Sequence, residues 1–254
     1  MIDTHCHLYV DELFDDIDAV LCRAESAGIN KFYLPAIDCT THGSMLKLEA
    51  MFPGKCFAMI GLHPCSVKAD YEKELADINK MLEQRSFAAI GETGLDFYWD
   101  TTFKAQQYLA LEKQIKWALE YQLPLVLHTR NAMQETIDVV KKYSGTGLNG
   151  IFHCFGGTLN EAEQIIDCGF LLGIGGVLTY KKSGLAEVLE KIDLKHIVLE
   201  TDAPYLSPVP YRGKRNESSY MVEVARKLAE IKNISYGEVD EQTTLNATRL
   251  FTKK

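Results

Sequence analysis

Repeated alternation of short apolar stretches with amphipathic segments is the feature that most restricts how this 254-residue chain can fold. Eight stretches rich in β-branched or aromatic residues are each followed by a segment with helical periodicity. Eight such units are typical of a single (β/α)8 TIM barrel, whose functional residues lie at the carboxyl ends of the strands. An open doubly wound sheet is the alternative, but its glycine-rich motif after the first strand is missing. The predicted strands are 1–5, 31–36, 56–64, 87–94, 124–129, 150–155, 170–176 and 196–202.

The segments between these strands have the apolar spacing of helices. No linker rich in Pro, Gly or Ser and no block of like charge interrupts the alternation. We therefore expect one domain over residues 1–254. The predicted helices are 11–28, 44–52, 71–84, 103–121, 132–143, 158–169 and 183–192, followed by a helical tail from about Ser218.

Charge and cysteine content narrow the class of protein. Thirty-five acidic against 27 basic residues give a net charge of −8, which argues against a globally positive surface that coats nucleic acid. Seven irregularly spaced cysteines without an N-terminal secretion signal indicate reduced thiols. Apolar runs such as "GFLLGIGGVL" are shorter than the roughly 20 residues that cross a bilayer. We expect a cytoplasmic monomer with no membrane contact.

Five of the seven histidines end a predicted strand, together with two acidic residues. His42 and His196 do not fit this pattern, and we expect both to be structural. Imidazole and carboxylate groups that converge on one cavity are what a divalent metal site requires. Residues two apart on a strand point to the same side, so His5 and His7 should face the barrel mouth and Cys6 the helices. The strand-end residues are His5, His7, His63, Glu92, His128, His153 and Asp202.

Six of these residues, all except His63, are more ligands than one open catalytic site needs. Glu92 lies on a strand midway round the barrel, where its carboxylate can bridge two ions. Two ions lower the pKa of a shared water, so the predicted reaction is hydrolysis, with Asp202 orienting or deprotonating that water. Four histidines favour Zn, Mn, Co or Ni over Mg. The predicted sets are His5, His7 and Asp202 on one ion, and His128 with His153 on the other.

Basic residues near the strand ends suggest contact with phosphates. Arg130 follows His128 by two residues, and "PYRGKRNE" brings Arg212, Lys214 and Arg215 together after the last strand. On the upper face of the barrel these groups can bind backbone phosphates. The alternative is that Arg130 pairs with a carboxylate and that the later loop is only solvated.

Aromatic residues follow Glu92 in "DFYW", which places Phe97, Tyr98 and Trp99 in one loop beside the predicted metals. Aromatic faces stack on unpaired bases with little sequence preference. Core packing is the alternative for one or two of the three. A narrow rim of this kind suits the end of a strand better than a long duplex.

Cys6 and Cys154 each adjoin a predicted ligand, and a thiolate is a good metal ligand. Strand alternation predicts that both thiols turn away from the cavity. We therefore expect both to be structural.

Six segments carry a resemblance to a known family: "DTHCHL", "GLHP", "GETGLDFYW", "LHTR", "HCF" and "ETDAPYLSPVPYRGKRNE". In this order and spacing, from Asp3 to Glu217, they resemble the TatD family of metal-dependent deoxyribonucleases, in the amidohydrolase-like superfamily. The resemblance implies a TIM barrel, two metal ions with Mg or Mn supporting activity, and phosphodiester hydrolysis, often as a 3′-to-5′ exonuclease on DNA. It implies a position near the scissile phosphate for His63. The family's metal ligands fall on His5, His7, Glu92, His128, His153 and Asp202.

Three residues depart from the family pattern. Tyr9 stands where an acidic or amide residue is common, and Asn131 and Gln134 stand where acidic residues are frequent. None is a predicted ligand. The departures therefore concern loop geometry and substrate preference rather than the metal centre.

The leading hypothesis is a nuclease that acts on single-stranded DNA or strand ends, with RNA as a further substrate class. Its predicted catalytic residues are Asp202, Glu92 and His63, and its predicted substrate contacts are His63, Arg130, Tyr98, Arg212 and Lys214. A hydrolase of small amides, lactones or phosphate esters is the rival, although it has no need of a basic and aromatic rim. A non-catalytic nucleic-acid-binding protein is the third hypothesis, which the complete ligand set argues against.

Overall fold

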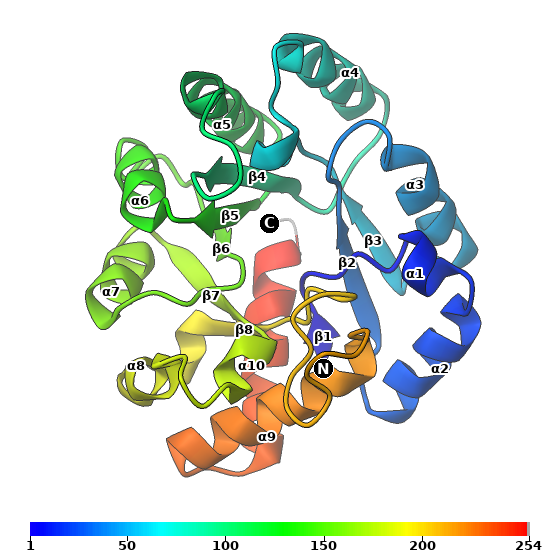
Figure 1. Ribbon diagram of the computed structural model, residues 1–254, viewed down its shortest axis with the longest axis vertical. Helices are drawn as coiled ribbons and strands as arrows, with labels where there is room; N and C mark the ends of the chain where they lie inside the picture. The colour runs from blue at the N-terminus through cyan, green and yellow to red at the C-terminus, as the bar shows by residue number, and fades with distance from the viewer. Residues whose placement is uncertain (253–254) are drawn as a thin grey trace.

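A computed structural model describes residues 1–252 as a (β/α)8 barrel, with parallel strands at the centre and helices around them (Figure 1). All eight predicted strands are present, although most are shorter than predicted. The strands are β1 (Ile2–Asp3), β2 (Lys31–Pro35), β3 (Cys56–Met59), β4 (Ile90–Asp96), β5 (Leu125–Arg130), β6 (Gly150–Phe152), β7 (Phe170–Ile174) and β8 (Ile197–Leu199).

The strands form two hydrogen-bonded sets, in the orders β1-β2-β3 and β4-β5-β6-β7-β8. Backbone contacts cross both gaps between the sets. Between β3 and β4, Ile60 bridges to Ile90, and Gly91 N–H donates to Ile60 O at 2.8 Å. Between β8 and β1, Thr4 N–H donates to Leu199 O at 3.1 Å. Because every pairing is parallel, the carboxyl ends of all the strands lie at one end of the barrel.

The helices lie where the sequence predicts them, with one exception. The segment 11–28 is not one helix, because the chain turns at Asp15 and Asp16 and the Asp16 carboxylate accepts hydrogen bonds from Arg215. The helices are α1 (Asp11–Phe14), α2 (Ile17–Ser26), α3 (His42–Met51), α4 (Tyr71–Gln84), α5 (Lys104–Glu120), α6 (Met133–Lys141), α7 (Leu159–Asp167), α8 (Leu185–Lys191), α9 (Met221–Lys232) and α10 (Tyr236–Phe251).

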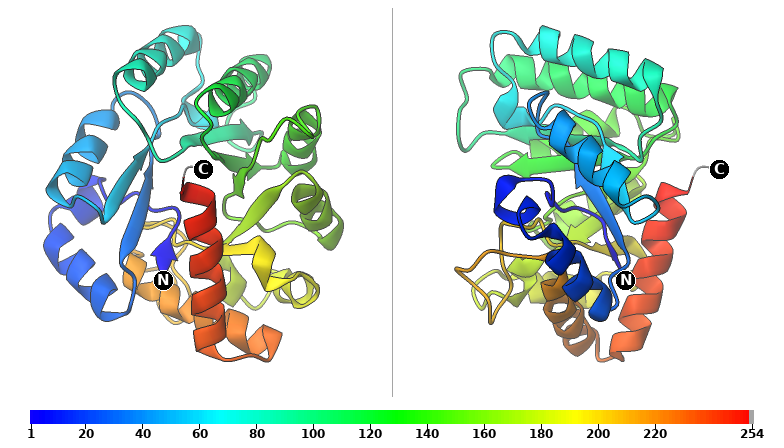
Figure 2. Two further views of the ribbon diagram at one scale, coloured as in Figure 1. Left: turned by 180° about the vertical axis from the view of Figure 1, so that it is seen from behind. Right: turned by 90° about the vertical axis from the view of Figure 1, so that its right-hand side faces the viewer.

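Apolar side chains fill the barrel at the amino ends of its strands. Val126, Ile151 and Val198 form one buried cluster with Ala247 of α10, and burial of each such aliphatic side chain contributes about 1.5–3 kcal/mol. Helix α10 lies across this end of the barrel, opposite the long loop 203–217 (Figure 2). The polar strand ends are therefore left to the other end. No helix within residues 1–252 combines the length and apolarity needed to cross a bilayer.

Candidate metal centre

Glu92 of β4 lies at the centre of the polar cluster, and its carboxylate is buried. Oε2 faces one pair of imidazoles, with His5 Nε2 at 3.2 Å and His7 Nε2 at 3.6 Å. Oε1 faces a second set: His128 Nδ1 at 2.9 Å, His63 Nε2 at 3.4 Å and His153 Nε2 at 3.9 Å. The two oxygens of one carboxylate thus point toward two groups of nitrogen donors, which is the arrangement expected of a bridging ligand.

Asp202 completes the side of the cluster formed by His5 and His7. Its Oδ1 lies 3.5 Å from His7 Nε2 and 3.7 Å from His5 Nε2. The Asp202 N–H donates to His5 O at 2.9 Å, which fixes the loop after β8 against the loop after β1. His153 lies between the two sides, because its ring stacks on that of His5 with 3.4 Å between centroids and its Nε2 is 3.8 Å from Asp202 Oδ1. The structure therefore brings all six predicted ligands and His63 into one cluster.

His5 and His7 both face the site as predicted, but the predicted cause, alternation along a strand, is wrong. Strand β1 ends at Asp3, so these histidines lie beyond the strand and alternation along it does not place them. The Asp3 carboxylate instead accepts hydrogen bonds from the Thr201 hydroxyl at 2.6 Å and the Ser218 hydroxyl at 2.7 Å, which anchors the chain just before them. Cys6 is buried as predicted.

The imidazoles and carboxylates shift one another's pKa values. Burial by itself would raise the pKa of Glu92, but the nearby His5 and His63 outweigh it and hold that pKa well below its usual range. Burial would lower the pKa of His153, but Glu200 and Asp202 raise it to about 10. Burial and the neighbouring His153 lower the pKa of His5. The centre therefore favours ionised carboxylates, which a cation can bind.

The donor set fits divalent metal ions. His5 is fully buried, yet neither of its ring nitrogens makes a hydrogen bond among residues 1–252, although Nε2 lies 3.2 Å from Glu92 Oε2. A buried polar atom without a partner is costly, and a metal ion satisfies an imidazole nitrogen. Within the described residues, three overlapping sets that include Glu92 or Asp202 each have donor atoms within 4.8 Å of one another. These sets are His5, His7 and Glu92; His5, His153 and Asp202; and His63, Glu92 and His128.

The groups that contact the outer side of these imidazoles were not predicted from the sequence. Asp96 ends β4 four residues after Glu92, so strand alternation could have found it, whereas Glu200 follows the end of β8 at Leu199, where alternation does not apply. Such partners fix the tautomer and orientation of a ligating histidine. Two hydrogen bonds of this kind join His7 Nδ1 to the Tyr9 hydroxyl at 2.9 Å and His128 Nε2 to Asp96 Oδ2 at 2.9 Å. His153 Nδ1 lies 3.0 Å from Glu200 Oε1, without the geometry of a hydrogen bond.

Tyr9, a departure from the family pattern, has a structural role at the centre. It is buried, and its hydroxyl donates to Pro35 O at 2.5 Å. Because the hydroxyl proton is used there, the oxygen accepts from His7 Nδ1–H. The lone pair of His7 Nε2 is therefore directed toward Glu92.

Glu200, beside His153, has a fully buried carboxylate. A Cβ on Gly173 would lie 2.2 Å from Glu200 Oε2, so β7 has room for this side chain only because position 173 is glycine. The prediction that the Cys154 thiol turns away from the site rests on strand alternation, which does not apply at this residue. Cys154 has φ +48°, which breaks strand alternation, and its sulfur lies within 4.8 Å of donor atoms of His153 and Glu200. Burial raises the pKa of this thiol well above its usual value.

Arg130, at the end of β5, lies over exposed aromatic rings. Its guanidinium carbon is 4.0 Å from the Tyr98 ring centroid and 5.1 Å from that of Trp99. The exposed fractions of Tyr98 and Trp99 are 52% and 68%, whereas Phe97 packs against the core. Within residues 1–252 no carboxylate forms an ion pair with Arg130. Two exposed aromatic side chains and a cation are thus available to a ligand beside His128.

The basic loop after β8 does not act as one unit. Arg215 binds the Asp16 carboxylate through both terminal nitrogens, at 2.7 and 2.9 Å, so its predicted grouping with the other two basic residues is wrong. Arg212 lies over the Tyr180 ring at 4.4 Å, and Lys214 is exposed. Only these two remain as predicted phosphate contacts in this loop.

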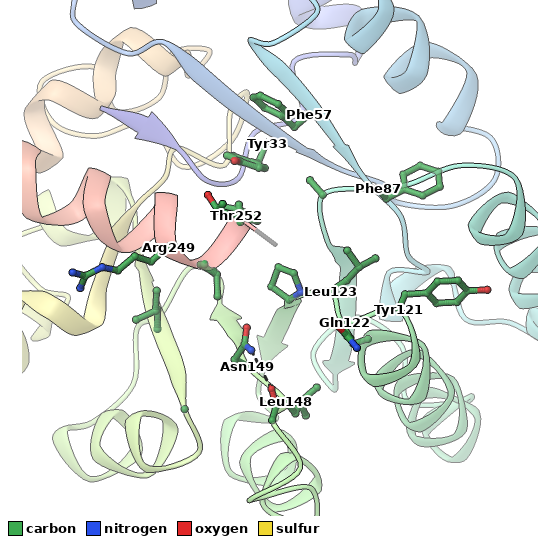
Figure 3. A pocket seen from close by; sticks show the side chains of 18 of the residues that line it. Tyr33, Phe57, Phe87, Tyr121, Gln122, Leu123, Leu148, Asn149, Arg249 and Thr252 are labelled. Carbon is green, nitrogen blue, oxygen red and sulfur yellow. Dashed lines mark hydrogen bonds between the residues drawn. The ribbon is translucent and has the colours of Figure 1, made fainter. Parts of the chain in front are cut away.

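A separate pocket lies at the amino end of the barrel. It has a volume of about 1170 Å³, and its lining includes Phe251 together with Tyr33 and Phe57, which lie near each other on one side of it (Figure 3). The Tyr33 ring stacks on Phe251 with 3.6 Å between centroids, which holds the end of α10 against the barrel. None of the groups of potential metal ligands within residues 1–252 lies there, nor do His42 and His196 belong to any such group. In a TIM barrel this end serves stability.

Comparison with known proteins agrees with the site. Residues 2–252 match the family described as TatD related DNase. The uncharacterized metal-dependent hydrolase YabD of Bacillus subtilis (strain 168) is 34% identical over 252 residues, which cover 99% of this chain and 98% of that protein. The 3′-5′ ssDNA/RNA exonuclease TatD of Erwinia tasmaniensis is 31% identical over 257 residues, with 99% of each chain covered.

The same relationship appears in three dimensions. The crystal structure of YjjV, a TatD homologue from Escherichia coli K12, superposes with a TM-score of 0.93 at 30% identity and covers 100% of this chain and 98% of that one. The barrel, the cluster around Glu92 and the match over residues 2–252 lead to one conclusion. The chain belongs to the TatD-related family of metal-dependent hydrolases.

Proposed function

We propose that the chain is a deoxyribonuclease that uses two divalent metal ions, Mg or Mn in activity, to remove nucleotides from the 3′ end of single-stranded DNA or strand ends. The carboxylate of Glu92 supports this proposal, because its two oxygens face separate sets of imidazoles. The relative from Erwinia tasmaniensis is named as an exonuclease on ssDNA and RNA, which makes RNA a second substrate class. Zn, Co and Ni are alternative ions that the histidine-rich set can bind.

Each residue of the centre has a distinct role in this proposal. Bound divalent ions lower the pKa of a shared water and stabilise charge on the attacking and leaving oxygens. Glu92 holds both ions, and His5, His7, His128, His153 and Asp202 supply the remaining ligands. Asp202 also orients the water and accepts its proton, because its carboxylate lies at the mouth beside His7. His63, 3.4 Å from Glu92, contacts the scissile phosphate.

The rim beside His128 is the observation that favours a nucleic-acid substrate. Exposed Tyr98 can stack on an unpaired base, while Arg130 supplies positive charge for the backbone. Arg212 and Lys214 extend the positive charge on the loop after β8. A hydrolase of small esters or amides needs no such surface.

Digestion of an end-labelled single-stranded DNA tests this function directly. We expect the oligonucleotide to shorten from its 3′ end with Mg or Mn, and to remain intact with EDTA or with Asp202→Ala. The matched control is Asp167→Ala, which removes an exposed acid on α7 and should digest like the unmodified protein. Intact DNA with every metal, together with turnover of small phosphate esters, lactones or amides, would contradict the nuclease. Tight DNA binding without turnover of any substrate would indicate a binding protein.

Removal of Arg130 should weaken use of the strand. In Arg130→Ala we expect KM for single-stranded DNA to rise about tenfold, because a phosphate contact of charge-assisted strength is lost. The slope of log KM against the logarithm of the salt concentration should decrease by the contribution of about one phosphate contact. The metal content of the protein should stay unchanged. Steady-state kinetics between 50 and 200 mM salt measure both effects. Kinetics identical to those of the unmodified protein at every salt concentration would exclude Arg130 from the substrate site.

Three further properties belong to the proposal as expectations from the sequence. These are a single hydrolase domain over residues 1–254, a monomeric state and a cytoplasmic location. Reduced thiols are consistent with that location, because every cysteine in the described residues is free.

A further inference from the structure

Asp96, at the carboxyl end of β4, has a buried carboxylate that touches two different parts of the site. Its Oδ2 lies 2.9 Å from His128 Nε2. Its Oδ1 accepts the backbone N–H of Tyr98 at 2.9 Å and that of Trp99 at 3.1 Å. One side chain therefore contacts both a predicted metal ligand and the backbone of the aromatic loop.

The backbone around Asp96 is held on both sides. Gln107 of α5 accepts from the Asp96 N–H at 2.9 Å and donates to the Asp96 carbonyl at 3.1 Å. The next residue, Phe97, donates its N–H to Arg130 O at 2.9 Å. Because these bonds come from the barrel and from a long helix, the backbone that carries the Asp96 carboxylate is held in place.

The contact with His128 selects one nitrogen of that imidazole as the metal ligand. His128 Nδ1 lies 2.9 Å from Glu92 Oε1, on the side of the metal centre, whereas Nε2 faces Asp96. A neutral imidazole has one N–H and one lone pair. A carboxylate can only accept a proton in a hydrogen bond, so Asp96 places the N–H on Nε2 and leaves the Nδ1 lone pair toward Glu92.

The contact with the loop fixes how its aromatic side chains are presented. Two consecutive N–H groups point at Asp96 Oδ1, so the chain turns at Tyr98 and Trp99. The rings of both residues lie beside the Arg130 guanidinium, and both are largely exposed. The loop is therefore held in a conformation that leaves both rings largely exposed.

We propose that Asp96 is a positioning residue that sets the ligand nitrogen of His128 through Oδ2 and the base-stacking loop through Oδ1. The role at His128 concerns metal binding alone. The role at the loop rests on the proposed action on single-stranded nucleic acid. A single carboxylate thus positions both the loop that stacks on the substrate and the histidine that binds the metal.

Asp96→Asn separates the two roles. The amide oxygen still accepts from the two loop N–H groups, and this fixes the amide NH2 toward His128. The NH2 donates to Nε2, which moves the imidazole proton to Nδ1 and removes the lone pair that faces Glu92. By calorimetric titration of Mn²⁺ we expect one site to weaken about 10- to 100-fold. Binding of an oligothymidine in EDTA should change less than about twofold, since the loop is retained.

Tyr98→Ala is the complementary variant. It should weaken oligothymidine binding about tenfold through loss of stacking, with both Mn²⁺ affinities unchanged. Trp99 reports this binding by fluorescence, because the chain has only two tryptophans and the other, Trp117, is buried. The two variants should therefore show opposite patterns.

Several results would overturn the proposal. Unchanged Mn²⁺ affinities in Asp96→Asn would exclude a role of Asp96 at His128. If Asp96→Asn lost as much oligothymidine affinity as Tyr98→Ala, the assignment of separate roles to Oδ1 and Oδ2 would be wrong. A nitrogen-15 spectrum of the Zn²⁺-loaded unmodified protein needs no variant, and a proton on His128 Nδ1 would also contradict it. If the unmodified protein binds no oligothymidine, the role at the loop and the proposed nuclease both fail, whereas the Mn²⁺ titration still decides the role at His128.

Discussion

Glu92→Gln should lower kcat by about 10³-fold or more while the protein remains folded. The substitution keeps the size of the side chain but removes the charge that faces His5 and His7 on one side and His128 on the other. Since one carboxylate serves both donor sets, Mn²⁺ affinity should fall at both sites. Steady-state kinetics with excess metal and calorimetric titration measure the two effects.

The control for Glu92→Gln is Glu163→Gln, the same change at an exposed position of α7. It should have normal kinetics and normal metal affinity. Circular dichroism and thermal unfolding in EDTA check that both variants fold. Normal turnover by folded Glu92→Gln would end the model of a bridged two-metal centre.

Gly94→Ala should lower the free energy of unfolding by about 2–4 kcal/mol, through backbone strain and overpacking. Gly94 has φ +141°, and a Cβ there would lie 2.0 Å from His128 O on the neighbouring strand. The atom in the way is backbone, so β4 and β5 must separate. Because Gly94 lies between Glu92 and Asp96, activity should fall as well, since both side chains move relative to His128.

Urea unfolding in EDTA measures the stability of Gly94→Ala without the contribution of bound metal. Gly145→Ala is the matched control, because Gly145 also has positive φ, at +79°, but has open space around its Cβ. We expect this control to cost about 1 kcal/mol from strain alone. Equal losses in the two variants would show that the approach of β5 to Gly94 is not what requires glycine.

The sequence was informative wherever a chemical constraint is local. Eight alternations predicted the barrel, and residues such as Glu92 and His128 were selected because they end strands. Their coming together required no knowledge of distances, since the carboxyl ends of parallel strands lie at one end of a barrel. The same reasoning failed where the strand itself ends early, as at His5, or where the backbone leaves the extended region, as at Cys154.

The partners of the charged side chains could not be predicted in the same way. Arg215 and Asp16 are far apart in sequence, and nothing in either segment indicates the bidentate pair between them. Arg130 was expected to contact a phosphate or to pair with a carboxylate, and its position over the Tyr98 ring was not predicted. Which partner a charged side chain contacts depends on differences of a few ångströms in the positions of separate loops.

The sequence by itself determined the type of fold, the end of the barrel that is polar, and the set of residues that gathers there, because strand and helix periodicities and strand-end positions are properties of short segments. Only the tertiary structure decided how that set is arranged. It showed that Glu92 faces donors with both oxygens, that Tyr9, Asp96 and Glu200 each contact the outer nitrogen of a histidine, and that His5 is left without a hydrogen-bond partner. Hydrogen bonds act over about 3 Å between residues far apart in the chain, so their pattern is fixed only when the barrel closes around them.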